Sequence, residues 1–197
     1  MHPAVKTVFF HELGHLIARE LNLKNFGVMG ATKEIVIYPS KHPWRDYDGA
    51  TIPLIPEGEE PDKPVVSIAE KLAVIPYGCF VEAIFLKKDF ETCFSSNNGG
   101  GKDLDNWATL RMKALDSKSL YQHVKDHFSL LTASNAFDEL FKIDVESYLV
   151  EEEGKYTVDL DKLKNLIKDF LSKHEELYLP FVEKIREFLP KQDGCSG

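Results

Sequence analysis

The sequence predicts one α+β domain that is predominantly helical and carries a small sheet. Three observations lead to this class. Apolar residues recur every three or four positions over most of the chain, which is the helical period. Only two short segments have the β-branched composition of strands. The chain has 197 residues, of which 43% are hydrophobic, and this is enough for a substantial core.

The N-terminal part is expected to hold a helix and then two strands. A mostly buried helix is predicted over residues 4–21, where apolar side chains keep the helical spacing. Residues 34–38 and 50–55 are the strand candidates, joined by a loop or wide hairpin over residues 40–49. Pro53 interrupts the second candidate, which is typical of an edge strand.

A second helix is predicted over residues 65–89, with a break or kink near Pro76. The ten residues after this proline carry a single charge, Glu82, so this helix should be buried on nearly all sides. Residues 95–101 read SSNNGGG and predict a flexible connection. Helical spacing resumes over residues 103–115.

The remaining residues are expected to be mainly helical. Amphipathic periodicity extends over residues 120–141, and the acidic stretch 151–154 interrupts it. A last helix follows, capped by Asp159 or Asp161. It continues or restarts around Pro180.

Charge and composition exclude several classes of protein. There are 32 acidic and 24 basic residues, and the net charge of −8 argues against nucleic-acid binding through phosphate neutralisation. We expect no membrane span, because no 18-residue apolar window is free of charge. The N-terminus lacks the pattern of a signal peptide. Three cysteines (Cys79, Cys93 and Cys195) are too few for a disulfide framework, and we expect a cytoplasmic protein.

An H-E-x-x-H motif lies inside the first predicted helix, at His11-Glu12-Leu13-Gly14-His15. Two histidines four residues apart are about 40° apart around a helix, so both imidazoles can reach one ion. Neutral imidazole suits Zn²⁺, which takes three protein ligands in catalytic sites and leaves a position for water. Glu12 lies beside the first histidine and can act as general base on that water. Gly14 costs about 1 kcal/mol relative to alanine in mid-helix and indicates close approach by another element.

The third metal ligand has two candidates. Glu82 is a lone carboxylate in an apolar helix, so it needs a metal, a ligating histidine ring or a lysine as its partner. Asp103 follows the glycine-rich connection at the start of the next helix, where an aspartate commonly serves as an N-cap instead. The spacing of the residues does not decide between them.

A family resemblance accompanies these motifs. HELGH resembles the HEAGH motif of the FtsH-type zinc proteases, and residues 34–39 look like the strand that follows the metal-binding helix in that family. Residues 77–85 resemble its G-R-x-A-E-E-L-x-F helix, with Cys79 at the arginine position. Residues 101–109 resemble its S-N-D-L-x-x-A-T segment, whose aspartate is the third zinc ligand.

The resemblance covers residues 5–115 and implies a zincin-like peptidase domain that binds Zn²⁺. It implies His11, His15 and Asp103 as the metal ligands, Glu12 as the base and Glu82 in a supporting helix. No G-x-x-x-x-G-K-[ST] sequence is present, so the ATPase module of the family is not expected.

The leading hypothesis is a zinc metalloendopeptidase that acts on a peptide or protein substrate without ATP. We interpret residues 1–197 as one domain, with a zinc-site core over 1–115 and a helical C-terminal part over 116–197. The strand at residues 34–38 is a candidate edge for pairing with an extended peptide. The alternatives are a zinc peptidase of the regulator-cleaving kind and an inactive or regulatory zinc-binding module that binds a protein partner. The family also makes a homo-oligomer possible.

Other histidines and cysteines carry no supporting motif. His123 and His127 are also four residues apart, but we expect them on a solvated helix face, and His174 lies among charges. Cys79 and Cys93 are expected to pack in the core.

Overall fold

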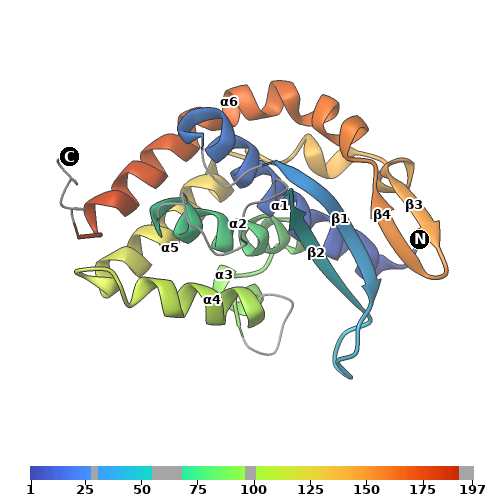
Figure 1. Cartoon of the computed structure of the whole chain (residues 1–197), viewed down its shortest axis with the longest axis horizontal. Coiled ribbons are helices and arrows are strands. Elements are labelled where there is room, and N and C mark those ends of the chain that lie inside the picture. Colours follow the sequence, from blue (N-terminus) through green and yellow to red (C-terminus); the bar gives the residue numbers. More distant parts are fainter. Residues whose placement is uncertain (28–30, 55–67, 96–100, 191–197) are drawn as a thin grey trace.

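The computed structural model describes residues 1–27, 31–54, 68–95 and 101–190. This part of the chain is predominantly helical and contains one four-stranded antiparallel sheet, which confirms the predicted fold class (Figure 1). The elements are, in order, α1 (Pro3–Phe26), β1 (Thr32–Pro39), β2 (Tyr47–Pro53), α2 (Ile68–Leu86), α3 (Phe90–Cys93), α4 (Gly101–Arg111), α5 (Ser117–Ala133), η1 (Leu140–Lys142), η2 (Val145–Tyr148), β3 (Leu149–Glu152), β4 (Lys155–Val158) and α6 (Leu160–Glu187).

Helix α1 is the buried centre of the molecule, as its apolar spacing predicts. It begins after His2, whose Nδ1 accepts a hydrogen bond from the Ala4 amide at 3.2 Å. Pro3 follows at the start of the helix, where the missing N–H is not needed. The helix passes its predicted end and stops at Gly27, which adopts the left-handed φ of 64° that favours glycine. The sheet lies against one side of α1, and the helices α2 and α6 pack on others (Figure 1).

The sheet has the strand order β2-β1-β4-β3. Strand β1 therefore lies between two neighbours, with Ile37 opposite Gly49 of β2 and opposite Tyr156 of β4. The prediction that residues 34–38 form a free edge is wrong, because β4 pairs on the side away from β2. Strand β2 is an edge of this sheet, as Pro53 indicated.

The hairpin β3–β4 forms where the sequence predicted only an interruption of the helical pattern, at residues 151–154. Glu153 and Gly154 turn the chain with φ values of 50° and 76°, and the strands pair on either side of them. Short strands of this kind have no clear periodicity, and the pairing of β4 with β1 joins parts of the chain far apart in sequence. The sequence alone therefore did not reveal this half of the sheet.

Helix α2 continues through Pro76 without the predicted break. A proline has no N–H, so the carbonyl of Leu72 lacks its usual helical donor. The indole Nε1 of Trp107, on α4, donates to that carbonyl at 3.2 Å. Helix α2 also crosses α1 closely at Gly14, where a Cβ would lie 2.3 Å from the carbonyl oxygen of Tyr77. The predicted close approach to Gly14 is confirmed.

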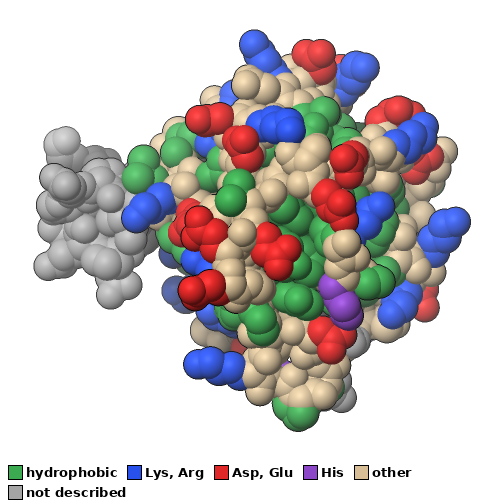
Figure 2. Space-filling model, turned by 90° about the vertical axis from the view of Figure 1, so that its right-hand side faces the viewer, with side chains coloured by type: hydrophobic (Ala, Val, Ile, Leu, Met, Phe, Trp, Pro, Cys, Tyr) green, Lys and Arg blue, Asp and Glu red, His purple; other side chains and the backbone are tan. Residues whose placement is uncertain are grey.

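The C-terminal part consists largely of two long helices. Helix α5 ends earlier than predicted, and Asn135 just beyond it has a left-handed φ of 52°. Helix α6 is capped by Asp159, which accepts from the amide of Lys162 at 3.0 Å, and it continues through Pro180. Among the described helices, none is both long enough and apolar enough to cross a bilayer. On the face drawn in Figure 2, acidic and basic side chains are interspersed with apolar ones.

His127 is buried and His123 is partly buried, which corrects the prediction that both lie on a solvated helix face, and His174, predicted to lie among charges, is buried as well. The ring of His127 stacks on Phe181 at 4.0 Å between centroids, and the Nε2 atoms of His127 and His174 lie 3.0 Å from the Tyr77 hydroxyl. Burial lowers the pKa of His174 to about 4, and the pKa of His127 also falls well below its usual value, mainly through burial. The apolar side chains around these histidines come from α2 and α6. The local sequence of α5 therefore does not predict that His127 is buried.

Candidate metal centre

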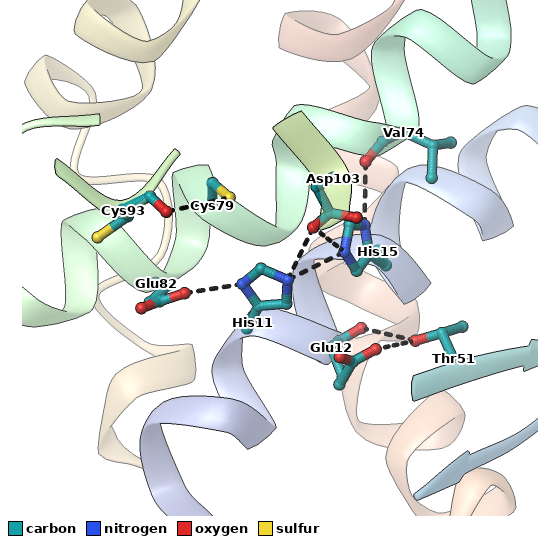
Figure 3. A network of polar contacts seen from close by, with 9 residues as sticks. All are labelled: His11, Glu12, His15, Thr51, Val74, Cys79, Glu82, Cys93 and Asp103. Atoms are coloured by element: carbon teal, nitrogen blue, oxygen red, sulfur yellow. Dashed lines mark hydrogen bonds and ion pairs between the residues drawn. The ribbon is translucent and has the colours of Figure 1, made fainter. Parts of the chain in front are cut away.

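Three helices bring the predicted site residues together (Figure 3). Helix α1 supplies His11, Glu12 and His15, helix α2 supplies Glu82, and helix α4 supplies Asp103. Most of these side chains are buried, with His11 only 7% exposed and Glu12 only 5% exposed. The motif lies in the middle of a 24-residue helix, so the backbone that carries it is rigidly held.

The inner ring atoms of the two motif histidines meet Asp103. His11 Nε2 and His15 Nε2 lie 3.2 Å apart, and Asp103 Oδ2 lies 3.0 Å from the first and 3.1 Å from the second. Ligand atoms of a tetrahedral zinc ion, each at about 2.0–2.1 Å from the metal, are separated by about 3.3 Å. The three atoms therefore form a triangle of the size that one such ion requires.

The outer ring atoms of the same histidines have separate partners. His11 Nδ1 donates to Glu82 Oε2 at 2.8 Å, and His15 Nδ1 donates to the carbonyl of Val74 at 3.1 Å. Hydrogen bonds of this kind fix the orientation and tautomer of a metal-binding histidine. Of the two carboxylates left open by the sequence, Asp103 meets the inner nitrogens and Glu82 supports a ring from behind.

Asp103 reaches the site from the first turn of α4. It is the third residue of a helix that begins at Gly101, so it is not the N-cap. Its carboxylate instead points to the two imidazoles, as Figure 3 shows. Trp107, one turn further on, is fully buried against α2 and fixes where this helix lies.

Gly78 allows α2 to pack directly against both imidazoles. A Cβ at this position would lie 2.5 Å from His15 Nε2 and 2.8 Å from His11 Nε2. The side chain of any larger residue would collide with both ring nitrogens. The donor set fits zinc, because imidazole nitrogens and a carboxylate oxygen are ligands that zinc accepts.

The carboxylates of the site favour positive charge on the imidazoles. Burial by itself lowers the pKa of His11, but hydrogen bonds to Asp103 and Glu82 outweigh it and raise that pKa well above its usual value. Burial raises the pKa of Asp103, but the charges and hydrogen bonds of His15 and His11 prevail and hold it well below its usual range. Protons on the imidazoles offset the negative charge of the carboxylates. A bound dication would replace these protons and offset the same charge.

Cys79 is a neighbour of the site that the sequence did not single out as a ligand. One ligand-capable atom each of His11, Cys79 and Asp103 lie within 4.8 Å of one another. This group is looser than the triangle with His15, whose edges span 3.0–3.2 Å. Burial raises the pKa of the Cys79 thiol well above its usual value, so the sulfur carries a proton. Nothing in the local sequence marks this cysteine as a neighbour of the two histidines, because α1 and α2 meet only in the fold.

Glu12 lies beside these residues and contacts β2. Its Oε2 accepts a hydrogen bond from the Thr51 hydroxyl at 2.7 Å (Figure 3). Glu12 follows His11 directly on α1, but its carboxylate contributes no atom to the triangle. In an H-E-x-x-H motif, a glutamate at this position can act as base on a metal-bound water.

Comparison with known proteins adds no family to this description. No family model matches the sequence, and no curated protein or solved structure shows significant similarity to it. The functional conclusion therefore depends on the residues of the site themselves.

Proposed function

We propose that the protein is a zinc metallopeptidase of the zincin type. His11, His15 and Asp103 would hold the metal, and Glu12 would be the general base. The observation that carries this proposal is the meeting of His11 Nε2, His15 Nε2 and Asp103 Oδ2 within 3.0–3.2 Å, with Glu12 beside them. Among the described residues, Cys79 and Cys93 are free thiols, which supports the cytoplasmic setting expected from the sequence.

The reaction would be hydrolysis of a peptide bond. When bound, zinc would supply a Lewis acid that acidifies a water molecule and polarises the scissile carbonyl. Glu12 would accept a proton from that water and pass it to the leaving amine nitrogen. Glu82 would keep the His11 ring in place through its bond to Nδ1, which lies 2.8 Å away.

An extended peptide would bind along β2. This strand is an edge of the sheet, and its residue Gly49 lies against the side chain of Glu12. A peptide that adds a strand at this edge gains main-chain hydrogen bonds irrespective of its sequence. It would also run past the base, so β2 takes the place of residues 34–38 as the candidate docking strand.

A second candidate function is a zinc-binding module without catalytic activity. The observation in its favour is Cys79, which is close enough to His11 and Asp103 to belong to the same cluster. A fourth protein ligand would close the metal to water, as in structural zinc sites. Cobalt substitution separates the two functions, because only a site with bound thiolate shows a sulfur-to-cobalt charge-transfer band.

The direct test is hydrolysis of a denatured protein by the zinc-loaded chain and by Glu12→Gln. We expect the variant to bind zinc as tightly as the unmodified chain and to lose at least about 100-fold in kcat. Glu183→Gln, at an exposed position of α6, is the matched control and should retain full activity. Hydrolysis by Glu12→Gln at the normal rate would contradict the role of Glu12.

A further inference from the structure

We infer that Thr51 is a positioning residue for the general base: it holds Oε2 of Glu12, so that Oε1 is the oxygen that accepts the proton. This inference rests on the proposed peptidase function and adds the residue that orients the base. Neither the H-E-x-x-H motif nor the segments around it point to Thr51, which lies on a different element of the fold.

The contact is direct and its direction is fixed by chemistry. Thr51 Oγ1 lies 2.7 Å from Glu12 Oε2, whereas its distance to the Glu12 backbone carbonyl is 3.5 Å. An ionised carboxylate has no hydrogen to donate, so the threonine hydroxyl must be the donor. A hydrogen bond to an ionised acceptor is about twice as strong as one between neutral groups. It therefore restrains the carboxylate to one orientation.

The sheet register places Thr51 and Gly49 on the face of β2 that looks toward α1. Thr51 is opposite Ile35 and Gly49 is opposite Ile37, and both isoleucines are buried in the core. Residues opposite each other in an antiparallel pair project to the same face of the sheet. Two positions of one strand thus approach Glu12 together, and the main-chain pairing with β1 fixes both.

Thr51 and Gly49 lie next to different oxygens of the Glu12 carboxylate. Thr51 binds Oε2, while Gly49 has no side chain in the space beside Oε1. A Cβ at Gly49 would lie 2.6 Å from Oε1 and 2.6 Å from Cγ1 of Val8. No side chain fits at this position, so β2 packs directly against Glu12 here, and Thr51 is the residue of β2 that hydrogen-bonds to the carboxylate.

The proton balance follows from this geometry. A water O–H bond breaks, and the proton forms a bond to Glu12 Oε1. The electron pair stays on the water oxygen, which bonds to the scissile carbonyl carbon as the C=O π pair moves to the carbonyl oxygen. The π bond then re-forms as the C–N bond breaks, the proton moves from Oε1 to the amine nitrogen, and Oε1 is ionised again. The Thr51 hydroxyl donates to Oε2 throughout and exchanges no proton.

Two substitutions separate the hydrogen bond from the packing of this side chain. Thr51→Val keeps the branched shape and removes the donor, whereas Thr51→Ser keeps the donor and removes a methyl group. With the zinc-loaded chain, we expect Thr51→Val to lower kcat by about 10- to 100-fold with KM unchanged. We expect Thr51→Ser to retain most of the activity. Equal losses in both variants, or no loss in Thr51→Val, would overturn the inference.

A second readout does not depend on turnover. In protein labelled with ¹³C at the glutamate carboxyl carbon, the Glu12 signal is assigned by its absence in Glu12→Gln. This signal should shift in Thr51→Val and keep its place in Thr51→Ser and in the control Thr109→Val, whose hydroxyl donates to the Asp105 carbonyl within α4. An unmoved signal in Thr51→Val refutes the inference. A moved signal in a protein that hydrolyses no peptide refutes the proposed function instead.

Discussion

Gly78 of α2 lies directly against the His15 ring of α1, with its missing side chain aimed at Nε2. A Cβ built on Gly78 would come within 2.5 Å of that nitrogen. Where α1 and α2 cross, a Cβ on Gly14 would come within 2.3 Å of the Tyr77 carbonyl oxygen. Two glycines, one on each helix, thus let α1 and α2 approach closely enough for α2 to form one wall of the candidate metal site.

The first prediction concerns this glycine. We expect Gly78→Ala to lower zinc affinity by about 100-fold or more, because the methyl group would collide with the Nε2 atoms of His11 and His15 and displace them. Zinc affinity is measured by competition with a chelator, and circular dichroism shows whether the variant remains helical. A folded Gly78→Ala protein that binds zinc with unchanged affinity would contradict the assignment of the metal position.

The second prediction separates the two carboxylates. Asp103→Asn removes a group that faces both Nε2 atoms, whereas Glu82→Gln changes only the support behind His11. We expect a loss of about 10- to 100-fold in zinc affinity for Glu82→Gln and a larger loss for Asp103→Asn. The same chelator titration measures both. The reverse order of losses would make Glu82 the ligand and Asp103 the support.

The third prediction concerns the hydrogen bond that replaces the one lost at Pro76. Trp107→Phe leaves the buried carbonyl of Leu72 without its indole donor. We expect the free energy of unfolding to fall by about 1–3 kcal/mol, measured by urea denaturation followed by circular dichroism. Trp44→Phe is the matched control, because Trp44 is 60% exposed. If both variants lose the same stability, the indole bond to Leu72 has no special role.

The fourth prediction is a pH dependence of stability. Burial lowers the pKa of His174 from 6.5 to about 4 in the folded chain. The unfolded chain therefore binds more protons in this window, so the free energy of unfolding falls as the pH is lowered from about 6.5 toward 4. For this one group the loss is about 2 kcal/mol at pH 5.

The measurement is urea denaturation at pH 7 and pH 5. His174→Asn should lose less stability between the two values than the unmodified chain does, because it lacks the titrating ring. His42→Asn, at an exposed position of the β1–β2 loop, should keep the pH dependence of the unmodified chain. The same pH dependence in His174→Asn as in the unmodified chain would show that the ring is not the titrating group.

Local sequence determined much of the helical framework. The spacing of apolar residues predicted α1, and Gly14 predicted that another element, found to be α2, approaches this helix closely. The motif placed His11, Glu12 and His15 on one helix, and Pro53 marked β2 as an edge. These features depend on residues a few positions apart, which share a helix face or a strand and need no distant partner to be recognised.

Tertiary structure decided which distant groups meet. It brought Asp103, and not Glu82, to the inner nitrogens of the histidines, and it set Thr51 against Glu12. It also placed β4 beside β1 and buried His127 under residues of α6. Each of these contacts joins elements separated by a long stretch of chain. The geometry of these contacts depends on how helices cross and how strands pair. The periodicity of a single segment predicts neither.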